Sequence, residues 1–195
     1  MVDSDALNRF ERHKQRTRQT LVQAALELIS SRGYDAVSVQ DITDRADVGR
    51  GTFYLHFKNK EDLLWGILQE YFDRLADETD ARYAAEPSPR REFLAWVDFF
   101  EKAKQNSYIY RLLRNINSPF LRERVAHYFL LRYEKGMREQ RYSANLNLPV
   151  DFLAAFAGGA SLSVLEWYME RTEQYTGREI AAMMYMVVFR QAPPE

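Results

Sequence analysis

The chain has 195 residues, of which 46% are apolar and 14% aromatic, so it can bury a sizeable core and does not have the composition of a disordered protein. It contains no cysteine, which excludes disulfides, thiolate metal sites and thiol redox sensing and is typical of a reducing cytoplasm. The net charge is −1, yet residues 1–60 carry ten Lys and Arg against eight Asp and Glu, so the positive charge is concentrated at the N-terminal end.

The first predicted helix runs from about Lys14 to Arg32. Apolar residues recur in it at helical spacing, and Gly33 follows as a stop signal. A basic cluster surrounds its start, and a phosphate backbone attracts such a cluster, although charge alone favours a solvated helix start. The residues before it are polar and mixed in charge, which is not the pattern of a signal peptide. The basic residues are Arg9, Arg12, Lys14, Arg16 and Arg18.

Two short helices with a tight turn between them are predicted next. Ser38 opens the first of them, with Asp41 three residues later as a short-armed capping box. A turn near Val48 leads into the second, from about Arg50 to Leu55. This is the geometry of a helix-turn-helix, which we place at about residues 37–56. Helices this short are unstable alone, so the flanking helices must brace them.

A long fourth helix follows, and the rest of the chain reads as further helices. Asn59 can cap the fourth helix, which ends before the two prolines of residues 86–89. We therefore predict an all-α fold of about nine helices, with an N-terminal helix-turn-helix domain at 14–74 and a larger helical domain at 75–195. The later helices are expected at about Arg90–Gln105, Tyr108–Asn115, Pro119–Gln140, Val150–Glu173 and Arg178–Gln191.

Side chains on the helix-turn-helix suit contact with DNA. Arg50 and Thr52 can reach base edges, and arginine is the side chain best shaped for guanine. Tyr54 and His56 can donate hydrogen bonds to phosphates. Each residue alone could be structural, but their combination at this spacing favours DNA contact. The predicted DNA-binding residues are Ser38, Gly49, Arg50, Gly51, Thr52, Tyr54, His56 and Lys60.

Two of these residues carry specific arguments. Gly51 has no side chain, so its backbone can approach DNA or a bracing helix closely. Lys60 lies at the start of the fourth helix, where the helix dipole slightly disfavours a cation but exposed amides favour an anion. This local misfit indicates that Lys60 serves a phosphate.

The stretch from about Lys14 to Phe72 resembles the DNA-binding domain of the tetracycline-repressor (TetR) family. The strongest match is the run from Gly51 to Leu63, with its aromatic pair, its His-Phe and its Lys-Glu. The family usually has glycine where Asp47 stands, often serine where Gly49 stands, and more often threonine in place of Ser38. The resemblance implies a homodimer, and a two-fold dimer with one reading head per chain is expected to bind a palindromic double-stranded DNA operator. The resemblance also implies that the domain at 75–195 serves ligand binding and dimerisation, with a cavity for a small-molecule effector that usually releases the DNA.

The last two predicted helices, at about residues 150–191, are apolar nearly all round. Such helices must be covered on both sides, and we predict that an identical chain supplies the second cover. The alternative is a monomer core with a tight helix crossing. The uncharged runs in both helices are shorter than the ~20 residues that cross a bilayer, so no membrane partner is expected.

Aromatic residues concentrate in the middle of the chain. Ligand pockets are mostly apolar with a few polar groups, so a subset of these residues is predicted to line a cavity for an apolar or aromatic effector. For each residue alone, ordinary core packing is the alternative. The candidates are Trp96, Phe99, Phe100, Tyr108, Tyr110, Phe129, Tyr133 and Trp167.

The sequence has no phosphate-cradling glycine loop, no nucleophile motif and no histidine pair for a metal. We therefore predict no catalytic residue, metal or cofactor. The resemblance implies a ligand-responsive repressor, and the lack of cysteine fits a cytoplasmic location. A regulator controlled by a protein partner, or by no ligand, is the first alternative. A helical enzyme or small-molecule-binding protein is the second, and specific retention on DNA would separate it from the regulators.

Overall fold

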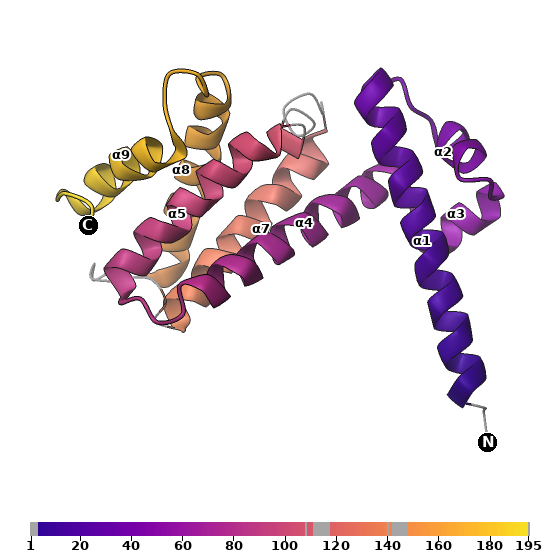
Figure 1. The fold of residues 1–195 in the computed structure, drawn as a ribbon, viewed down its shortest axis with the longest axis horizontal. Helices are drawn as coiled ribbons and strands as arrows, with labels where there is room; N and C mark the ends of the chain where they lie inside the picture. Colours follow the sequence, from indigo (N-terminus) through magenta and orange to yellow (C-terminus); the bar gives the residue numbers. More distant parts are fainter. Residues whose placement is uncertain (1–3, 108, 111–117, 140, 142–147, 195) are drawn as a thin grey trace. The chain divides into compact units, whose positions relative to one another are not determined.

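The computed structural model describes residues 4–107, 109–110, 118–139, 141 and 148–194, and its regular elements are all α-helices (Figure 1). The all-α prediction is confirmed, and about nine helices is an approximate count, since eight lie in the described part. The helix expected at 108–115 falls almost entirely outside it. The elements are α1 (Ser4–Arg32), α2 (Val39–Arg45), α3 (Arg50–His56), α4 (Lys60–Arg82), α5 (Ser88–Gln105), α7 (Pro119–Arg138), α8 (Val150–Met169) and α9 (Gly177–Phe189).

The chain packs into two compact units, which we call the head unit (Met1–Leu68) and the body unit (Gln69–Glu195). The division falls inside α4, so this helix contributes its first turns to the head unit and the remainder to the body unit. The functional domain boundary predicted at residue 74 stays a prediction.

The head unit is built from α1, α2, α3 and the start of α4. Its core consists of side chains with no exposed surface, among them Leu21, Ile42, Phe53 and Leu64. Capping follows the expected chemistry at α2, where the Asp41 amide donates to Ser38 Oγ at 3.1 Å and the Ser38 amide donates to Asp41 Oδ2 at 2.8 Å. These contacts fix the short helices where the sequence predicts them.

Helix α1 begins ten residues earlier than predicted. The prediction used apolar periodicity, and residues 9–16 are all exposed, so they carry no such signal. The added residues include the good helix formers Ala6, Leu7, Arg9, Glu11 and Arg12, which favour continuation of the helix toward the N-terminus.

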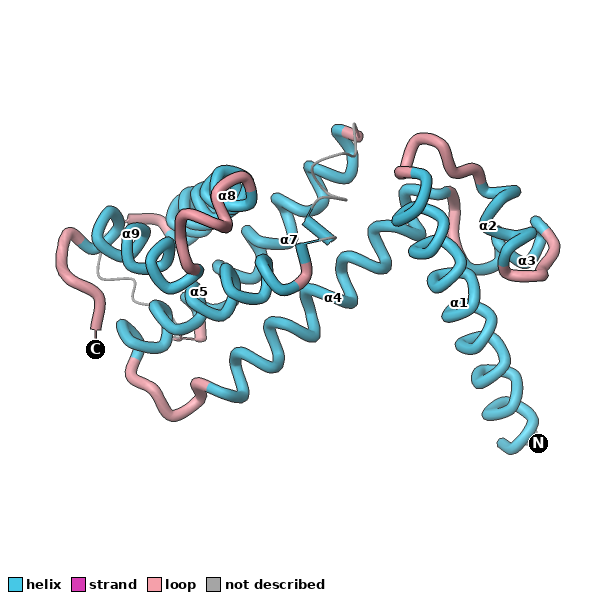
Figure 2. The backbone as a smooth tube through the Cα atoms, turned by 45° about the horizontal axis from the view of Figure 1, so that its top comes forward, coloured by secondary structure: helices cyan, strands magenta, loops and turns pink. Residues whose placement is uncertain are grey.

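In the body unit, α7 packs mainly against α8, and α5 packs mainly against α9 (Figures 1 and 2). The second pair meets at Gly177, where an added Cβ would lie 2.6 Å from the backbone nitrogen of Glu101. A glycine is required there because the start of α9 touches the α5 backbone. This approach buries Phe100 and Tyr168 in the core.

Helix α8 is only partly covered. Leu153, Ala154 and Leu165 are buried, whereas Phe152 is 56% exposed and Phe156 is exposed as well. Among the described helices, α8 alone has the length and apolar composition of a membrane span, and 28% of that window is buried. Length and composition are weak evidence for a membrane span, because the core helix of a soluble protein has both.

Candidate nucleic-acid interface and ligand cavity

Helix α3 has one buried face and one exposed face. Phe53 is fully buried, and Phe57, just after the helix, is buried with it. Their rings lie 5.7 Å apart and anchor α3 to the head core. On the other face Arg50 is exposed, and the Tyr54 side chain is 58% exposed. The helix is therefore held by its aromatic residues while its polar side chains are presented outward.

Five of the eight predicted DNA-binding residues lie on α3: Arg50, Gly51, Thr52, Tyr54 and His56. The other three lie at helix ends. Gly49 is the N-cap of α3 and Ser38 the N-cap of α2, while Lys60 is the first residue of α4. Contact of these residues with DNA stays a prediction.

Gly51 stands in open space. A Cβ added there would meet nothing within 4 Å, so no bracing helix approaches it. Close approach to another helix, one of the two reasons considered for this glycine, is therefore absent in the head unit. The glycine leaves room for a molecule outside the protein.

Lys60 has an internal role that the sequence prediction missed. Its ammonium donates to the carbonyl oxygens of Tyr34 at 2.7 Å and Val37 at 2.6 Å, and it lies 4.0 Å from the centroid of the Tyr34 ring. Lys60 thus ties the start of α4 to the loop between α1 and α2. Burial lowers the pKa of Lys60, while the nearby acidic residues oppose this shift. Two of its three donors are used, which leaves one for a phosphate.

The basic start of α1 lies beside the end of α3. Burial, followed by the charges of Lys14 and Arg18, lowers the pKa of His56, so its imidazole is neutral near pH 7. Arg18 also packs over the Phe57 ring, 5.3 Å from its centroid, and Gly66 leaves room for it. Lys14 and Arg18 of α1 therefore place positive charge near His56, the last residue of α3.

The turn between α2 and α3 contains a residue with positive φ. Asp47 has φ 53°, the left-handed conformation in which glycine is most favourable. Position 47 is one of the departures noted above, where the TetR family usually has glycine. Aspartate tolerates this conformation better than most residues, so the tight turn is kept.

The body unit contains a cavity of about 90 Å³. Four of the eight residues predicted to bind a ligand lie in its wall, namely Trp96, Phe99, Phe129 and Tyr133. The lining residues that come from α4 recur at helical spacing, so they lie on one face of that helix. A search for this periodicity in α4 could have found them. The lining residues are Phe72, Leu75, Ala76, Thr79, Asp80, Glu92, Ala95, Trp96, Phe99, Tyr128, Phe129, Arg132, Tyr133 and Ser161.

The other predicted ligand residues are elsewhere. Phe100 and Tyr110 are buried but do not line the cavity, and Phe100 packs edge-on against Tyr168 in the core. Trp167 lies outside the cavity under the guanidinium of Arg171, 4.5 Å from the ring centroid. Tyr108 lies outside the described residues. Aromatic content alone could not separate cavity from core, because both use the same side chains.

Several polar side chains of the cavity wall already donate to partners in the protein. Apart from Trp96 and Tyr133, neither these groups nor their partners were predicted from the sequence. The reason is that the contacts join different helices. The hydrogen bonds are Thr79 Oγ1 to Asp98 Oδ2 at 3.2 Å, Tyr128 OH to Asp73 Oδ1 at 2.8 Å and Trp96 Nε1 to Tyr133 OH at 2.6 Å, and the Tyr133 and Ser161 hydroxyls lie 2.9 Å apart.

Asp80, at the cavity, is surrounded by three arginines. Arg132 Nη2 donates to its Oδ2 at 3.0 Å, and Arg141 donates to the same oxygen. Arg91 lies 3.9 Å from Oδ1 and also donates to the Asp80 carbonyl at 3.3 Å. Asp80 on α4 is thus tied to α5 through Arg91 and to α7 through Arg132.

Comparisons with known proteins agree with this architecture. A sequence profile described as "Bacterial regulatory proteins, tetR family" matches residues 21–65. The transcriptional repressor DhaR of Mycobacterium sp. (strain GP1) is 45% identical over 58 residues, which are 30% of this chain and 29% of DhaR. The transcriptional activator FasR of Mycolicibacterium smegmatis is 33% identical over 107 residues, 54% of this chain and 48% of FasR. The chain thus matches less than half the length of either relative.

The fold likeness extends further along the chain. The regulator FadR from Bacillus subtilis, solved in complex with stearoyl-CoA, superposes with a TM-score of 0.61 at 18% identity and covers 87% of this chain and 96% of FadR. The sequence match includes α2, α3 and the start of α4, and the structural match includes the body helices as well. The head unit is therefore similar to the DNA-binding domain of the TetR family of bacterial regulatory proteins, and the body helices share the fold of this solved regulator.

Proposed function

We propose that this chain is a cytoplasmic, ligand-responsive transcriptional repressor that binds a palindromic operator as a homodimer. The observation that carries the proposal is α3, a helix fixed by Phe53 and presenting Arg50 and Tyr54 outward from a TetR-type head. Side chains so placed can enter the major groove and read base edges. The positive region at the start of α1 adds attraction to phosphates.

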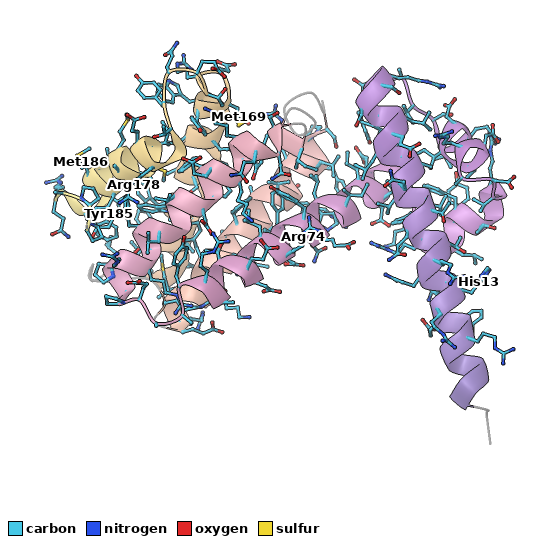
Figure 3. All side chains as sticks on the ribbon, viewed as in Figure 1. His13, Arg74, Met169, Arg178, Tyr185 and Met186 are labelled. Carbon is cyan, nitrogen blue, oxygen red and sulfur yellow. The ribbon has the colours of Figure 1, made fainter. Side chains whose placement is uncertain are left out.

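The homodimer is supported by an apolar face on α8 and α9. Phe152 and Phe156, four residues apart, are exposed on α8, and Val187 of α9 is 75% exposed. On α9, Met186 is exposed while its neighbour Tyr185 is buried against Phe93, so the helix has a covered and an uncovered side (Figure 3). A second copy of the chain would cover this face by isologous pairing.

Control by a ligand is supported by the cavity and by α4. This helix contributes Phe72, Leu75 and Asp80 to the cavity wall, and its first residue is Lys60, which braces the head. A ligand that favours one position of α4 over another would change the affinity for DNA. The complex of FadR with stearoyl-CoA is a small-molecule complex of a protein with this fold.

Footprinting of genomic fragments with the purified full chain tests the DNA-binding proposal. We expect protection of a palindromic site whose half-sites lie about 34–36 Å apart, or a small multiple of that distance, and a dimer by sedimentation. Binding to random DNA with no preferred site would contradict the proposal. Retention of a metabolite without any DNA binding would favour a small-molecule-binding protein.

A substitution at Arg50 tests whether α3 recognises the bases of the operator. Arg50→Ala should weaken operator binding by about 1–3 kcal/mol while random DNA is bound almost as before, because only the operator offers the correct base edge. Arg138→Ala, which removes an exposed arginine of α7 paired with Glu134, is the control and should leave both affinities unchanged.

A further inference from the structure

Arg132 is a cavity-lining side chain with hydrogen-bond donors to spare. Its Nη2 donates to Asp80, and no other hydrogen bond from it reaches a residue in the described part of the chain. A guanidinium has five N–H donors in a planar fork, so most of this group is available to a ligand. By contrast, the hydroxyls of Thr79 and Tyr128 and the indole of Trp96 already donate to partners inside the protein.

The charges around Arg132 favour an anion. Arg91, Arg132 and Arg141 face the single carboxylate of Asp80, and Arg141 also pairs with Glu139 at 2.7 Å. The cluster therefore holds three guanidinium groups and two carboxylates. Glu92, a buried carboxylate that also lines the cavity, lies outside this cluster of pairs and has a partner of its own. A ligand carboxylate could take Arg132 while Asp80 keeps its other two arginines, so no buried charge would be left unpaired.

The wall beside this cluster is aromatic. The Phe129 ring meets those of Phe72 and Phe99 edge to face, with centroids 5.2 and 5.5 Å away. Another ring placed among them can make the same edge-to-face contacts. The volume of about 90 Å³ is smaller than the ~150 Å³ of a cavity that takes benzene. Because the cavity is partly open to solvent and not closed on all sides, a single ring can still enter it, with its polar substituent outside the aromatic wall and beside the charged residues.

We propose that the cavity binds a monocyclic aromatic carboxylate, with the ring against Phe72, Phe99 and Phe129 and the carboxylate on Arg132. The inference rests on the proposed ligand-responsive function and gives its effector a chemical class. Such a ligand shares the guanidinium of Arg132 with Asp80, and the second carboxylate weakens the pair between Arg132 and Asp80. It therefore loosens a tie between α7 and α4, which links occupancy of the cavity to the helix that continues into the head unit.

Calorimetric titration of the full-length dimer with benzoate, benzyl alcohol and hexanoate at pH 7 tests the proposal. Benzyl alcohol has the ring without the charge, and hexanoate has the charge without the ring. Benzoate should bind at least about tenfold more tightly than either, the ratio expected for one charged hydrogen-bond pair. Equal affinity for benzyl alcohol would overturn the role of the anion, and equal affinity for hexanoate would overturn that of the ring.

Two variants assign the anion site. Arg132→Gln should remove the preference for benzoate over benzyl alcohol, whereas Arg91→Gln should keep it, because Arg91 contacts Asp80 without lining the cavity. Thermal melting checks that both fold. Should Arg132→Gln not fold, Arg132→Lys, which keeps the charge and loses the fork, should reduce the preference severalfold. A preference that survives in every folded Arg132 variant would overturn the proposal.

Operator affinity is measured separately from the binding of the three compounds. Benzoate binding that depends on Arg132 but leaves operator affinity unchanged supports the anion site and contradicts ligand-responsive control. Operator binding with no heat from any of the three compounds overturns the inference and leaves the DNA-binding function standing. The two failures are thus distinguishable.

Discussion

A substitution at Gly51 should affect the stability of the head unit and its affinity for DNA differently. Its Cβ position is empty, and glycine costs roughly 0.5–1 kcal/mol in a helix compared with alanine. Gly51→Ala should therefore leave the head unit as stable as before, or stabilise it by up to about 1 kcal/mol, yet lower operator affinity because the methyl group meets the DNA. Thermal melting and operator titration measure the two effects. Unchanged operator affinity would show that the backbone at this position does not approach DNA closely.

Lys60 should affect both stability and DNA binding. Lys60→Met leaves the carbonyls of Tyr34 and Val37 without their charged donor, so we expect the head unit to lose about 2 kcal/mol of stability. If the remaining donor reaches a phosphate, the affinities for operator and for random DNA should fall equally. The slope of log affinity against log salt concentration should also become smaller by about one. Lys58→Met, at an exposed lysine two residues earlier, is the control for stability. A melting temperature equal to that of the control would contradict the bracing role.

At the scale of elements, sequence reasoning succeeded where local chemistry sets the structure. The Ser38–Asp41 capping box and the Asn59 cap, whose Oδ1 accepts from the Asp62 amide at 2.8 Å, follow from neighbouring residues. Contacts between distant segments could not be predicted in this way. The Lys60 ammonium reaches carbonyls 23 and 26 residues away, and Arg132 reaches Asp80 from 52 residues away.

The start of α1 illustrates a second limit. Periodicity detects a buried stripe, and residues 9–16 have none, so periodicity could not reveal the extension of the helix to Ser4. The same reasoning explains α8. Its residues are apolar on all sides, which predicts cover on both sides, but the sequence does not say whether the second cover belongs to the same chain.

At the scale of the whole molecule, the proposed ligand and operator must influence each other reciprocally. If saturating benzoate weakens operator binding by some factor, bound operator must weaken benzoate binding by the same factor, typically about 5–150-fold. Calorimetry of benzoate against the free and the operator-bound dimer measures one side, and operator titration with and without benzoate measures the other. Equal benzoate affinity in both states would show that the cavity is not coupled to the head.

Helix α3 has one buried and one exposed face, and this division affects how the DNA specificity of such a protein can evolve. Phe53 and Phe57 hold the helix from within, while Arg50 and Tyr54 face outward and make no ion pair or hydrogen bond to the described residues of the chain. Mutations at these outward positions therefore cost the fold little. After gene duplication, one copy could acquire a new operator through a few such changes while its core stayed the same. The same freedom makes α3 a suitable place to redirect this regulator to a chosen DNA site.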